Sequence, residues 1–586
     1  MIRILLIAVI GILANSISAA DFNTITNNTF WKTVDDEYIF SQGGGIFRFP
    51  DPATGEEHYY WYGVKYQEAV DYAPKALGAP QSNITHFVSV TCYQSDDLVN
   101  WKFVNDVMTF NSFNGHEFPW WVGRLGVAYV KDAKTYALFV QYNESVGVFT
   151  CDTPTGNFTY HQQIDMTAMT GKPKTGDQTV FTDDDGESYL CYSYASGRNR
   201  IYLSKIGVTD NGKIGLLDCN QIYKGSGREG DCMFKYKGKY YVCASDLYGW
   251  NASNVYYLEA ESIYGPYTPT NSMQKMPGAA DDYGHVTQTG FFYTLKGTNE
   301  ETVIYCGDRW AGFAGNGNGF NQWVPITFED GKPFFNSLSQ WSLNPITGEW
   351  KVGKENNYIR NFSFDADRKN IPSDNKPAQT YIKGWSFDII KGNKVVQGGA
   401  DSPVLNAKNT STDRETVMGN FCLNISDKVD FTRKIYQSIK STTRVPLSDG
   451  IYKMTAKVNN SSDFNSLYIY ATSGEKNYKT DITDNDGTWH TVSIEEIEIT
   501  DGKAEVGIYA DGKAGDVAKF DDLTLIKIRD KESSSIENII TSTESGYNSV
   551  EYYSLTGQKS SSPMKGINIV REISNGKIST KKIVVK

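Results

Sequence analysis

Five copies of one strand pattern recur between residues 42 and 305 and limit the folds that this chain can adopt. Each copy joins an apolar strand that opens with a small or polar residue to a second, Tyr-rich strand. The first strands are expected to open at Gln42, Gly123, Asp177, Glu229 and Gln288. The resulting spacings of 81, 54, 52 and 59 residues match a unit of roughly 50 residues with several strands, the signature of a β-propeller. Five copies predict five blades.

The composition favours strands throughout the chain. Tyr, Phe and Trp make up 13% of the 586 residues, and 53 residues are Gly. Aromatic side chains fit a pleated sheet, and Gly serves the turns. No amphipathic helix of ten or more residues separates the strands, which argues against a parallel α/β fold. We therefore predict an all-β protein with a five-bladed β-propeller over residues 21–360, followed by a jelly-roll β-sandwich and a small C-terminal β module.

The N-terminus predicts export. Arg3 precedes an apolar run at 4–13 and small residues at 18–20, the pattern of a signal peptide over residues 1–20. The apolar run is shorter than the roughly 20 residues of a membrane-spanning helix, and no later segment reaches that length. The eight cysteines form no C-x-x-C pair, which argues against a zinc ribbon. Buried thiols are expected, with one or two disulfides as the alternative in an exported protein.

Residues 376–528 lack the repeat and show short alternating strands, for example at 450–458 and 504–510. This spacing predicts a β-sandwich. The closing run FDDLTL at 520–525 resembles jelly-roll carbohydrate-binding modules, which implies a sugar platform of exposed Trp or Tyr and a structural Ca²⁺ near Asp521. The alternative is a spacer that packs on the propeller without binding sugar.

The C-terminal residues carry a signal of their own. A linker is predicted at 529–546, and residues 547–586 read as three short strands separated by turns. The motifs YSLTGQ at 553–558, KGINIV at 565–570 and KKIVVK at 581–586 resemble the C-terminal sorting domain read by the type IX secretion system of Bacteroidota. The resemblance implies transport across the outer membrane, with the type IX machinery as a partner.

The repeat also predicts a site. Residues that open the inner strands of a propeller meet at one mouth of its central channel, so Asp177 and Glu229 are expected to face each other there. Two carboxylates are what glycoside hydrolysis requires. One of them, as an acid, protonates the leaving oxygen and needs a pKa raised by burial or by a neighbouring negative charge. The alternative is that both acids form ordinary salt bridges at strand ends.

Ordered motifs between residues 37 and 351 resemble glycoside hydrolase family 43, and within it the branch of exo-β-1,3-galactanases and related enzymes. They are GGGI at 43–46, YWYG at 60–63, YQSDDLVNW at 93–101, GDQTVFTDDDG at 176–186, RE at 228–229, MFK at 233–235, GWN at 249–251, GDRW at 307–310 and QWVP at 322–325. The resemblance implies an inverting enzyme built on a five-bladed propeller.

The resemblance also implies roles for three residues. Glu229 matches the family's general acid, and Asp177 matches the Asp that raises the pKa of this acid and orients it. In the galactanase-like branch a Gln on the fifth blade is proposed to position or activate the water in its imidic form, and Gln288 matches it.

Two carboxylates of the family pattern are absent. Gln42 stands where the first blade carries the Asp base, and Gly123 followed by Arg124 replaces a Glu of the second blade. A neutral amide scarcely accepts a proton, although it can orient a water molecule. Asp231 or Asp308 is therefore a candidate for taking the proton. For Asp308 the alternative is an ion pair at the end of a blade.

Further residues are expected to contact sugar around these carboxylates. They are Gln42, Arg124, Trp61, Trp121, Trp250, Asp308, Arg309 and Trp310. Aromatic rings offer large flat faces for this purpose, and packing between blades is the alternative for at least half of the Trp residues. His285 is a candidate for organising a central cation or water, with a structural role as the alternative.

No cofactor is expected for the chemistry, and no residue is assigned to a metal. A structural Ca²⁺ in the propeller or the sandwich is the one ion considered. The acidic run DDDG at 183–186 lacks the ligand spacing of a calcium loop, and a hairpin turn is the better interpretation.

These observations predict an exported, exo-acting glycoside hydrolase that releases galactose from a β-1,3-galactan or arabinogalactan-type plant polysaccharide. An α-L-arabinofuranosidase or β-xylosidase on the same fold is the alternative within this class. A propeller that binds glycan without cleaving it is the alternative from another class, because of the two absent carboxylates. The expected partner is a plant polysaccharide or oligosaccharide, and the expected location is the medium or the surface of a Bacteroidota-type bacterium. The net charge of −11 argues against nucleic acid as a partner.

Overall fold

The structure is a computed structural model. It describes residues 22–27, 29–73, 86–118, 121–142, 145–247, 253–278, 287–309, 320–364, 382, 384–396, 399–408, 421–531, 549–554, 559–560, 562–574 and 577–585. The chain forms two compact units, residues 1–528 and 529–586. The predicted signal peptide and most of the predicted linker lie outside the described residues. Within the described ranges, no helix is both long and apolar enough to cross a membrane.

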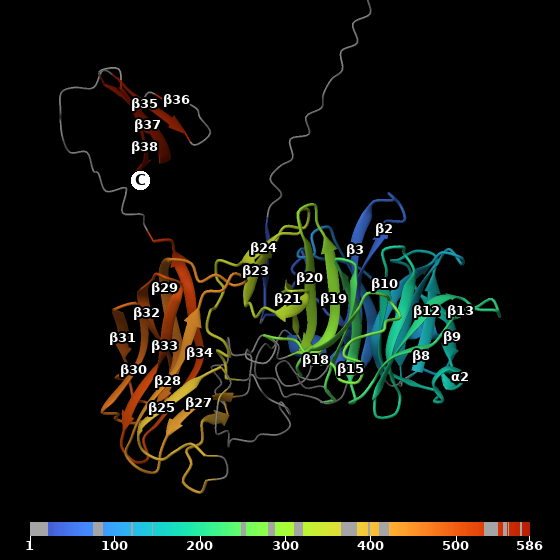
Figure 1. Cartoon of the computed structure of the whole chain (residues 1–586), viewed down its shortest axis with the longest axis horizontal. Coiled ribbons are helices and arrows are strands. Elements are labelled where there is room, and N and C mark those ends of the chain that lie inside the picture. Colours follow the sequence, from blue (N-terminus) through green and yellow to red (C-terminus); the bar gives the residue numbers. More distant parts are fainter. Residues whose placement is uncertain are drawn as a thin grey trace, which may run out of the picture. The chain divides into compact units, whose positions relative to one another are not determined.

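The described residues form an all-β protein, as predicted (Figure 1). The helical segments are short: α1 (Gln67–Tyr72), α2 (Thr167–Thr170) and the 3₁₀ helix η2 (Phe110–Phe113). Strands dominate because the chain is rich in aromatic and β-branched residues, which pack well on a pleated surface.

Five antiparallel sheets follow one another between residues 42 and 335. The first contains β2 (Gln42–Pro50), β3 (Glu57–Tyr66), β4 (Phe87–Ser95) and β5 (Lys102–Met108), and the second contains β6 (Val122–Val130), β7 (Thr135–Tyr142), β8 (Ser145–Cys151) and β9 (Thr159–Ile164). The third contains β10 (Thr175–Thr182), β11 (Ser188–Tyr194), β12 (Arg200–Val208), β13 (Ile214–Leu216) and β14 (Asn220–Lys224). The fourth contains β15 (Glu229–Tyr236), β16 (Lys239–Ser245), β17 (Tyr256–Ala260) and β18 (Gln274–Lys275), and the fifth contains β19 (Gln288–Lys296), β20 (Glu301–Arg309), β21 (Phe320–Glu329) and β22 (Lys332–Phe335).

The first strands of these sheets contact one another in a closed cycle. β2 contacts β6, β6 contacts β10, β10 contacts β15, β15 contacts β19, and β19 contacts β2. We call this arrangement the ring. Aromatic side chains pack between its neighbouring sheets. The centroids of the Phe47 and Phe291 phenyl groups lie 5.8 Å apart, and those of Phe234 and Phe292 lie 4.8 Å apart. Much of the aromatic excess is thus core, including the Tyr-rich second strands, in which Tyr60, Tyr62 and Tyr241 are buried.

Each first strand of the ring contains a β-bulge at its start. In β2, Gln42 pairs with Val64 but Gly45 pairs with Tyr62, so that two residues intervene on one strand and one on the other. The same irregularity follows the opening residues of the other four first strands, which are Val122, Thr175, Glu229 and Gln288. A bulge inserts one extra residue and redirects the side chains around it.

These bulges correct the predicted alignment of the repeat. The residues equivalent to Glu229 are Gln42, Val122, Thr175 and Gln288, so Gly123 and Asp177 do not open their strands. Asp177 occupies the second bulge position, whose equivalents in the other sheets are Gly44, Arg124, Asp231 and Gly290. The prediction that Asp177 and Glu229 are equivalent was wrong, because it matched residue types whereas strand pairing fixes position.

A small sheet joins the start of the chain to the residues that follow the ring. It contains β1 (Asn23–Thr26), β23 (Gln340–Leu343) and β24 (Trp350–Val352). Asn23 pairs with Leu343 and Thr26 with Gln340, so that the N-terminal segment is held by residues more than 300 positions away.

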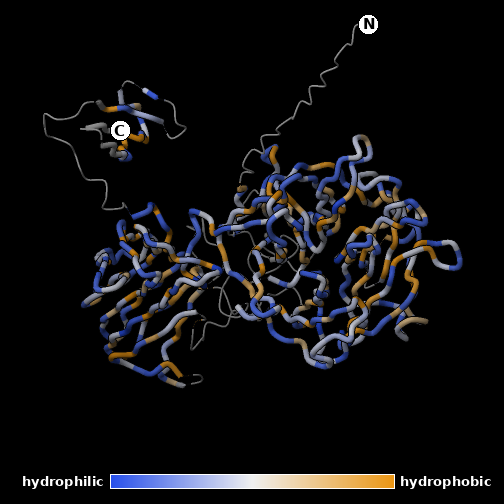
Figure 2. The backbone as a smooth tube through the Cα atoms, turned by 45° about the horizontal axis from the view of Figure 1, so that its top comes forward, coloured by the Kyte–Doolittle hydropathy of each residue, from blue (hydrophilic) through white to orange (hydrophobic). Residues whose placement is uncertain are grey.

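Two five-stranded sheets follow and share one hydrophobic core. One contains β25 (Ser386–Lys391), β28 (Phe431–Lys440), β33 (Lys503–Gly512), β30 (Ser466–Ser473) and β31 (Lys476–Asp481) in this order. The other contains β26 (Asn406–Lys408), β27 (Phe421–Ser426), β34 (Val517–Arg529), β29 (Gly450–Asn460) and β32 (Trp489–Ile499). Buried and less buried positions alternate along strands of these two sheets such as β29 and β34, as sheets with one buried face require, and hydrophobic residues recur between hydrophilic ones there (Figure 2).

The second unit is a four-stranded sheet, one strand more than predicted. Its strands, in the order β36-β35-β37-β38, are β35 (Ser549–Ser554), β36 (Lys559–Ser560), β37 (Gly566–Ser574) and β38 (Lys577–Val585). The short β36 pairs with Tyr552 and Tyr553 of β35.

The acidic run at 183–186 forms the hairpin turn between β10 and β11, as predicted. The Asp183 amide donates to the Glu187 carbonyl, and Gly186 adopts a φ of 78°. Lys235 Nζ lies 2.7 Å from Asp183 Oδ1 and 3.1 Å from Asp184 Oδ2, so these carboxylates are neutralised by an amine. Among the described residues, no group of three or more His, Cys, Asp or Glu side chains is placed to hold a metal ion.

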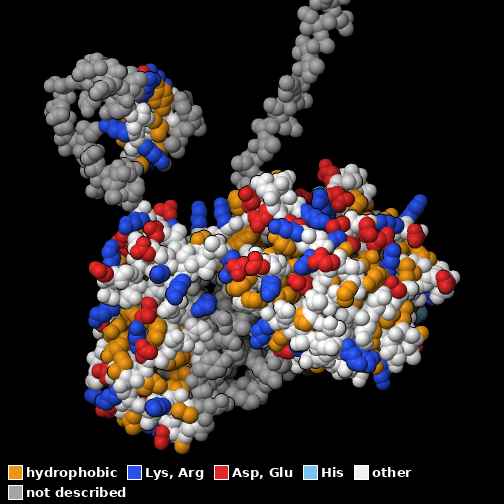
Figure 3. Space-filling view, in the orientation of Figure 1, with side chains coloured by type: hydrophobic (Ala, Val, Ile, Leu, Met, Phe, Trp, Pro, Cys, Tyr) orange, Lys and Arg blue, Asp and Glu red, His pale blue; other side chains and the backbone are white. Residues whose placement is uncertain are grey.

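The distribution of surface charge and the state of the cysteines were the other features expected from the sequence. Basic and acidic side chains are interspersed on the face seen in Figure 3. All eight cysteines are free thiols.

Candidate active site

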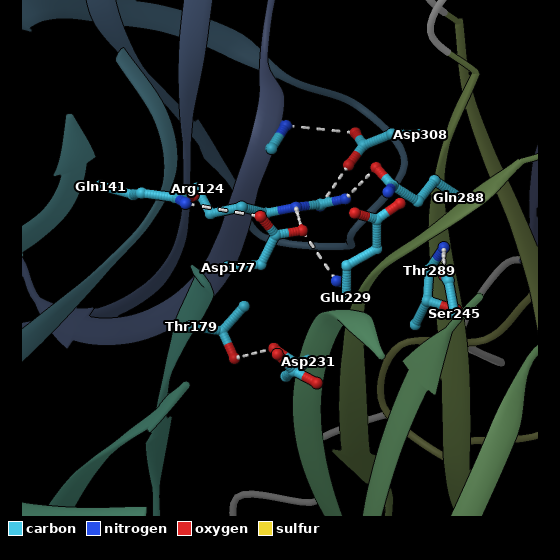
Figure 4. Close-up of polar contacts among 12 residues, drawn as sticks. Arg124, Gln141, Asp177, Thr179, Glu229, Asp231, Ser245, Gln288, Thr289 and Asp308 are labelled. Carbon is cyan, nitrogen blue, oxygen red and sulfur yellow. Dashed lines mark hydrogen bonds and ion pairs between the residues drawn. The ribbon is translucent and has the colours of Figure 1, made fainter. Parts of the chain in front are cut away.

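The bulges bring polar side chains from four sheets of the ring together (Figure 4). Arg124 on β6, Asp177 on β10 and Asp231 on β15 share the second bulge position, while Glu229 and Gln288 open β15 and β19. All five side chains are buried. Buried polar groups of this kind are stable only when they are paired or neutral, so their mutual contacts decide which of them carry charge.

Arg124 connects three of these side chains. Its Nη1 donates to Asp308 Oδ2 and its Nη2 donates to Gln288 Oε1, both at 2.7 Å, and its Nε lies 3.7 Å from Asp177 Oδ2. Burial disfavours the guanidinium charge, but the neighbouring Asp308 and Asp177 carboxylates raise the pKa of Arg124 above its ordinary value. Arg124 was predicted to contact sugar. Its guanidinium is instead 4% exposed and bound to protein side chains.

Asp177 is held as a carboxylate. Its Oδ2 accepts a hydrogen bond from the Gly230 amide at 2.8 Å, and its Oδ1 lies 3.4 Å from both Gln141 Nε2 and Arg198 Nη1. Burial alone would raise the pKa of Asp177, but Arg198, Arg124 and the Gly230 amide outweigh it and hold the pKa below its ordinary value.

Glu229 lies next to Asp177, and both carboxylates face Arg198. Arg198 Nε lies 3.9 Å from Glu229 Oε2, and the Glu229 side chain is 10% exposed. In Figure 4 its carboxylate points toward the Gln288 amide and the Arg124 guanidinium. Arg198 therefore bridges two carboxylates of neighbouring strands, Asp177 and Glu229.

Sequence reasoning missed Arg198. It lies in the turn between β11 and β12 with a φ of 47°. A signal was present, because β11 runs antiparallel to β10 and its end must therefore lie beside the start of β10. An Arg in the turn that follows a Tyr-rich second strand could have been placed near Asp177 on this ground.

Asp308 forms an ion pair rather than a free carboxylate. It lies on β20 opposite Gln288, accepts from Arg124, and its Oδ1 accepts from the Gly43 amide at 3.2 Å. Burial raises the pKa of Asp308, opposed by Arg124. The ion pair that was considered as an alternative for this residue is thus present, formed with Arg124. Gln42, the residue before Gly43, opens β2 and is buried.

Asp231 is the fourth acid of the site, after Asp177, Glu229 and Asp308. It is fully buried, and its backbone carbonyl accepts from Thr179 Oγ1 at 2.9 Å. Burial and the negative charges of Asp177 and Glu229 raise the pKa of Asp231 far above that of an ordinary Asp. Ionisation of Asp231 is therefore disfavoured, which argues against this residue as the acceptor of a proton from the attacking water.

The predicted aromatic contacts divide into two groups. Trp61 is 3% exposed, with its ring 5.3 Å from Trp101 and 4.9 Å from Trp323. The prediction that Trp61 binds sugar was wrong, because β3 turns this side chain into the core. Trp121 lies half-buried just before β6, and its ring covers Gly123: a Cβ atom there would lie 2.1 Å from the indole.

The other predicted contacts fall largely beyond the described part of the chain. Trp250, Trp310 and His285 lie outside the described residues. Of Arg309 only the backbone is described, at the end of β20 and paired with Phe320.

Comparison with known families identifies the class of protein. Residues 75–321 match the model of glycosyl hydrolases family 43. This segment covers most of the ring and includes Arg124, Asp177, Glu229 and Gln288. The chain thus carries a family 43 domain, and the protein is a glycosidase.

Several solved structures are similar to this chain. An exo-β-1,3-galactanase of Phanerochaete chrysosporium, solved with β-1,3-galactotriose, is 20% identical, with a TM-score of 0.48 and coverage of 86% of this chain and 100% of the other. An exo-β-1,3-galactanase of Clostridium thermocellum is 17% identical, with the same TM-score and coverage. An arabinoxylan arabinofuranohydrolase of Bacillus subtilis is 16% identical, with a TM-score of 0.32 and coverage of 83% and 96%. No curated protein matches the sequence.

Proposed function

We propose that this glycosidase is an inverting, exo-acting enzyme that cleaves galactosidic linkages in β-1,3-galactan or arabinogalactan-type plant polysaccharide, with Glu229 as the general acid. The observation that carries the proposal is the arrangement of Asp177, Arg198 and Glu229. One carboxylate is held charged by two guanidinium groups and a backbone amide, and the Glu229 carboxyl group lies beside it, with its Oε2 3.9 Å from Arg198 Nε.

The proposed reaction uses the two carboxyl groups differently. Protonated Glu229 gives its proton to the glycosidic oxygen as the bond to the anomeric carbon breaks, and it leaves the step as a carboxylate. Asp177 stays ionised and favours the protonated form of its neighbour, because two negative charges at close range repel each other. Gln288 orients the water that attacks the opposite face of the sugar, and the proton that this water loses passes to the solvent, from which Glu229 is protonated again. Arg198 is the cation that offsets the negative charge of Asp177 and Glu229.

The substrate part of the proposal rests on the motifs of the sequence. The ordered motifs from GGGI at 43–46 to QWVP at 322–325 resemble the galactanase-like branch, and the lack of an acid at Gln42 agrees with that branch. The absence of an acid at Gly123 does not. An α-L-arabinofuranosidase or β-xylosidase is therefore the second candidate, and a glycan-binding protein without activity is the third.

The proposed architecture follows the chain order. The five sheets of the ring are the blades of a propeller within residues 21–360, and the two sheets between 386 and 529 are a jelly-roll sandwich of the carbohydrate-binding type within 376–528. The sheet after residue 548 is a sorting domain for type IX secretion, preceded by a linker at 529–546. With a signal peptide at 1–20 as a further part of the proposal, we expect the enzyme in the medium or on the cell surface. A structural Ca²⁺ in either larger region is part of the proposal.

Product analysis tests the function. The purified enzyme is incubated with β-1,3-galactan, arabinan and xylan, and the products are separated and their anomeric configuration is followed by NMR. We expect galactose from the first substrate, released with inverted configuration. Glu229→Gln should lower the rate by about 10³-fold or more, since a positioned general acid contributes on the order of 10²–10⁴-fold.

Glu187→Gln is the matched control. Glu187 lies on the hairpin at the other end of β10, where it pairs with Lys205, and its variant should keep full activity. Arabinose or xylose as the product would support the second candidate. Binding without any product would support the third.

A further inference from the structure

One hydrogen bond fixes which end of the Gln288 amide faces Glu229. Arg124 Nη2 lies 2.7 Å from Gln288 Oε1. A guanidinium group has five N–H donors and no acceptor, so the Gln288 atom beside it must be the carbonyl oxygen rather than the amide nitrogen. The Nε2 group then lies on the other side of the amide, and Figure 4 shows it toward the Glu229 carboxylate.

Arg124 is itself held in place and is therefore able to impose this orientation. Its Nη1 donates to Asp308 Oδ2, and its Nε faces Asp177 Oδ2. Asp308 is in turn fixed by the Gly43 amide. The planar guanidinium thus contacts three side chains on two different sheets, in a fixed geometry that a lysine ammonium cannot reproduce.

A glycine makes this anchoring possible. Gly290 occupies on β19 the bulge position that Arg124 occupies on β6. A Cβ atom at Gly290 would lie 2.8 Å from Asp308 Oδ2 and 2.5 Å from the Cys306 carbonyl oxygen. The missing side chain leaves the space in which the Asp308 carboxylate meets Arg124.

We propose that Arg124 is a positioning residue that holds Gln288 as a hydrogen-bond donor toward the reacting groups, so that Gln288 does not take the proton of the attacking water. The imidic tautomer would carry its proton on Oε1, where Arg124 already presents an N–H. A protonated Oε1 is a weaker acceptor for this N–H than an amide oxygen, so the ion-paired guanidinium favours the amide form of Gln288. The activity measurements that test this role rest on the proposed glycosidase function.

The first test replaces Arg124. Activity on a β-1,3-linked galactooligosaccharide is measured for Arg124→Lys and Arg124→Met, with Arg48→Met as the matched control, since Arg48 lies near the other end of β2. We expect kcat to fall at least 10²-fold in both Arg124 variants, KM to change less than threefold, and the control to keep its activity. An Arg124→Lys enzyme with wild-type kcat would overturn the proposal.

Chemical rescue separates positioning from folding. Guanidinium ion at millimolar concentration should restore kcat of Arg124→Ala at least tenfold, without changing Gln288→Ala. A folded Arg124→Ala enzyme, shown by an unchanged circular-dichroism spectrum, that is not restored would contradict the proposal. Gln288→Glu replaces the donor by an acceptor and should lower kcat. An unchanged or raised kcat would show that the position serves as a proton acceptor.

Neutron diffraction of the wild-type crystal tests the orientation without any activity measurement. We expect deuterons on the Gln288 nitrogen that faces Glu229 and none on the atom that faces Arg124. The opposite distribution would refute the inference. A wild-type enzyme that cleaves no glycan but shows the expected deuterons would refute the proposed function and keep the assigned orientation.

Discussion

Asp177 and Asp231 occupy the same bulge position on neighbouring strands of the ring, yet their ionisation differs. Asp177 faces Arg198, Arg124 and the Gly230 amide, and its pKa lies below the ordinary value. Asp231 is fully buried beside the negative charges of Asp177 and Glu229, and its pKa lies far above that value. The repeat of the backbone therefore decides where a side chain lies, while its neighbours decide its charge.

The comparison also explains why three acids can lie so close together. Like charges in a buried site cannot all be ionised at low cost. The site contains the cations Arg124 and Arg198, which lie next to Asp177 and, through Arg198, next to Glu229. Asp231 follows Glu229 by two residues, and its raised pKa disfavours a further negative charge there.

The largest expected effect comes from removing the charge of Asp177. Asp177→Asn keeps the shape of the side chain but leaves Arg198 with Glu229 as its remaining carboxylate partner in this group, which favours the ionised form of the proposed acid. We expect kcat/KM on the galactooligosaccharide to fall by about 10³-fold. Asp185→Asn, in the exposed hairpin turn, is the matched control and should be unaffected. Retained activity in Asp177→Asn would remove this residue from the proposed mechanism.

Asp231→Asn should affect stability more than activity. Because the pKa of Asp231 is raised in the folded protein, the unfolded chain loses this proton near pH 4 while the folded protein keeps it. The stability contribution of Asp231 is thus present below pH 4 and is lost as pH rises. The Asn variant lacks this loss. Its free energy of unfolding, relative to that of the wild type, should therefore rise by up to about 1.4 kcal/mol per pH unit above pH 4.

Urea unfolding of both proteins between pH 4 and pH 8 measures this slope, with activity expected to stay within about threefold. The Asp177→Asn variant should show the opposite sign. The pKa of Asp177 is lowered in the folded wild-type protein, so the wild-type advantage is present above pH 4 and disappears as the pH falls below it, which requires that the series for this variant extend below pH 4. Parallel pH profiles for wild type and Asp231→Asn would mean that Asp231 is ionised.

The smallest effect is expected for Ser193→Ala. The Ser193 hydroxyl slightly lowers the pKa of Asp231, and its removal should raise that pKa further. We expect a stability change of about 1 kcal/mol or less and unchanged kcat, measured by the same unfolding series and activity assay. A tenfold loss of activity would show that Ser193 or an ionised Asp231 takes part in the reaction.

The sequence predicted the repeated strands well because their signal is local. Alternation, aromatic content and turn residues lie within each unit of roughly 50 residues. The alignment between the copies was less accurate, because a bulge adds one residue that no side-chain type marks. Gly43 and Gly230, with φ values of 66° and 64°, mark two of the five bulges. Gly123 lies at the equivalent position but does not adopt a positive φ.

The contacts of the site were harder to predict than its members. Arg124 and Asp308 are 184 residues apart, and Arg124 and Gln288 are 164 apart. Only closure of the ring brings them together, so the sequence suggested sugar contacts for side chains that bind each other. Trp61 was misassigned for a related reason, because its partners Trp101 and Trp323 come from distant strands.

The stacking of Trp121 on Gly123 has a consequence for how this site can change over generations. Any side chain at position 123 would begin 2.1 Å from the indole, so a single substitution that introduces an acid there meets a steric barrier. The indole has to be replaced or displaced first, and that step removes a large aromatic face beside the site. Positions 121 and 123 are therefore coupled in evolution, and an acid at position 123 requires a change at Trp121 first.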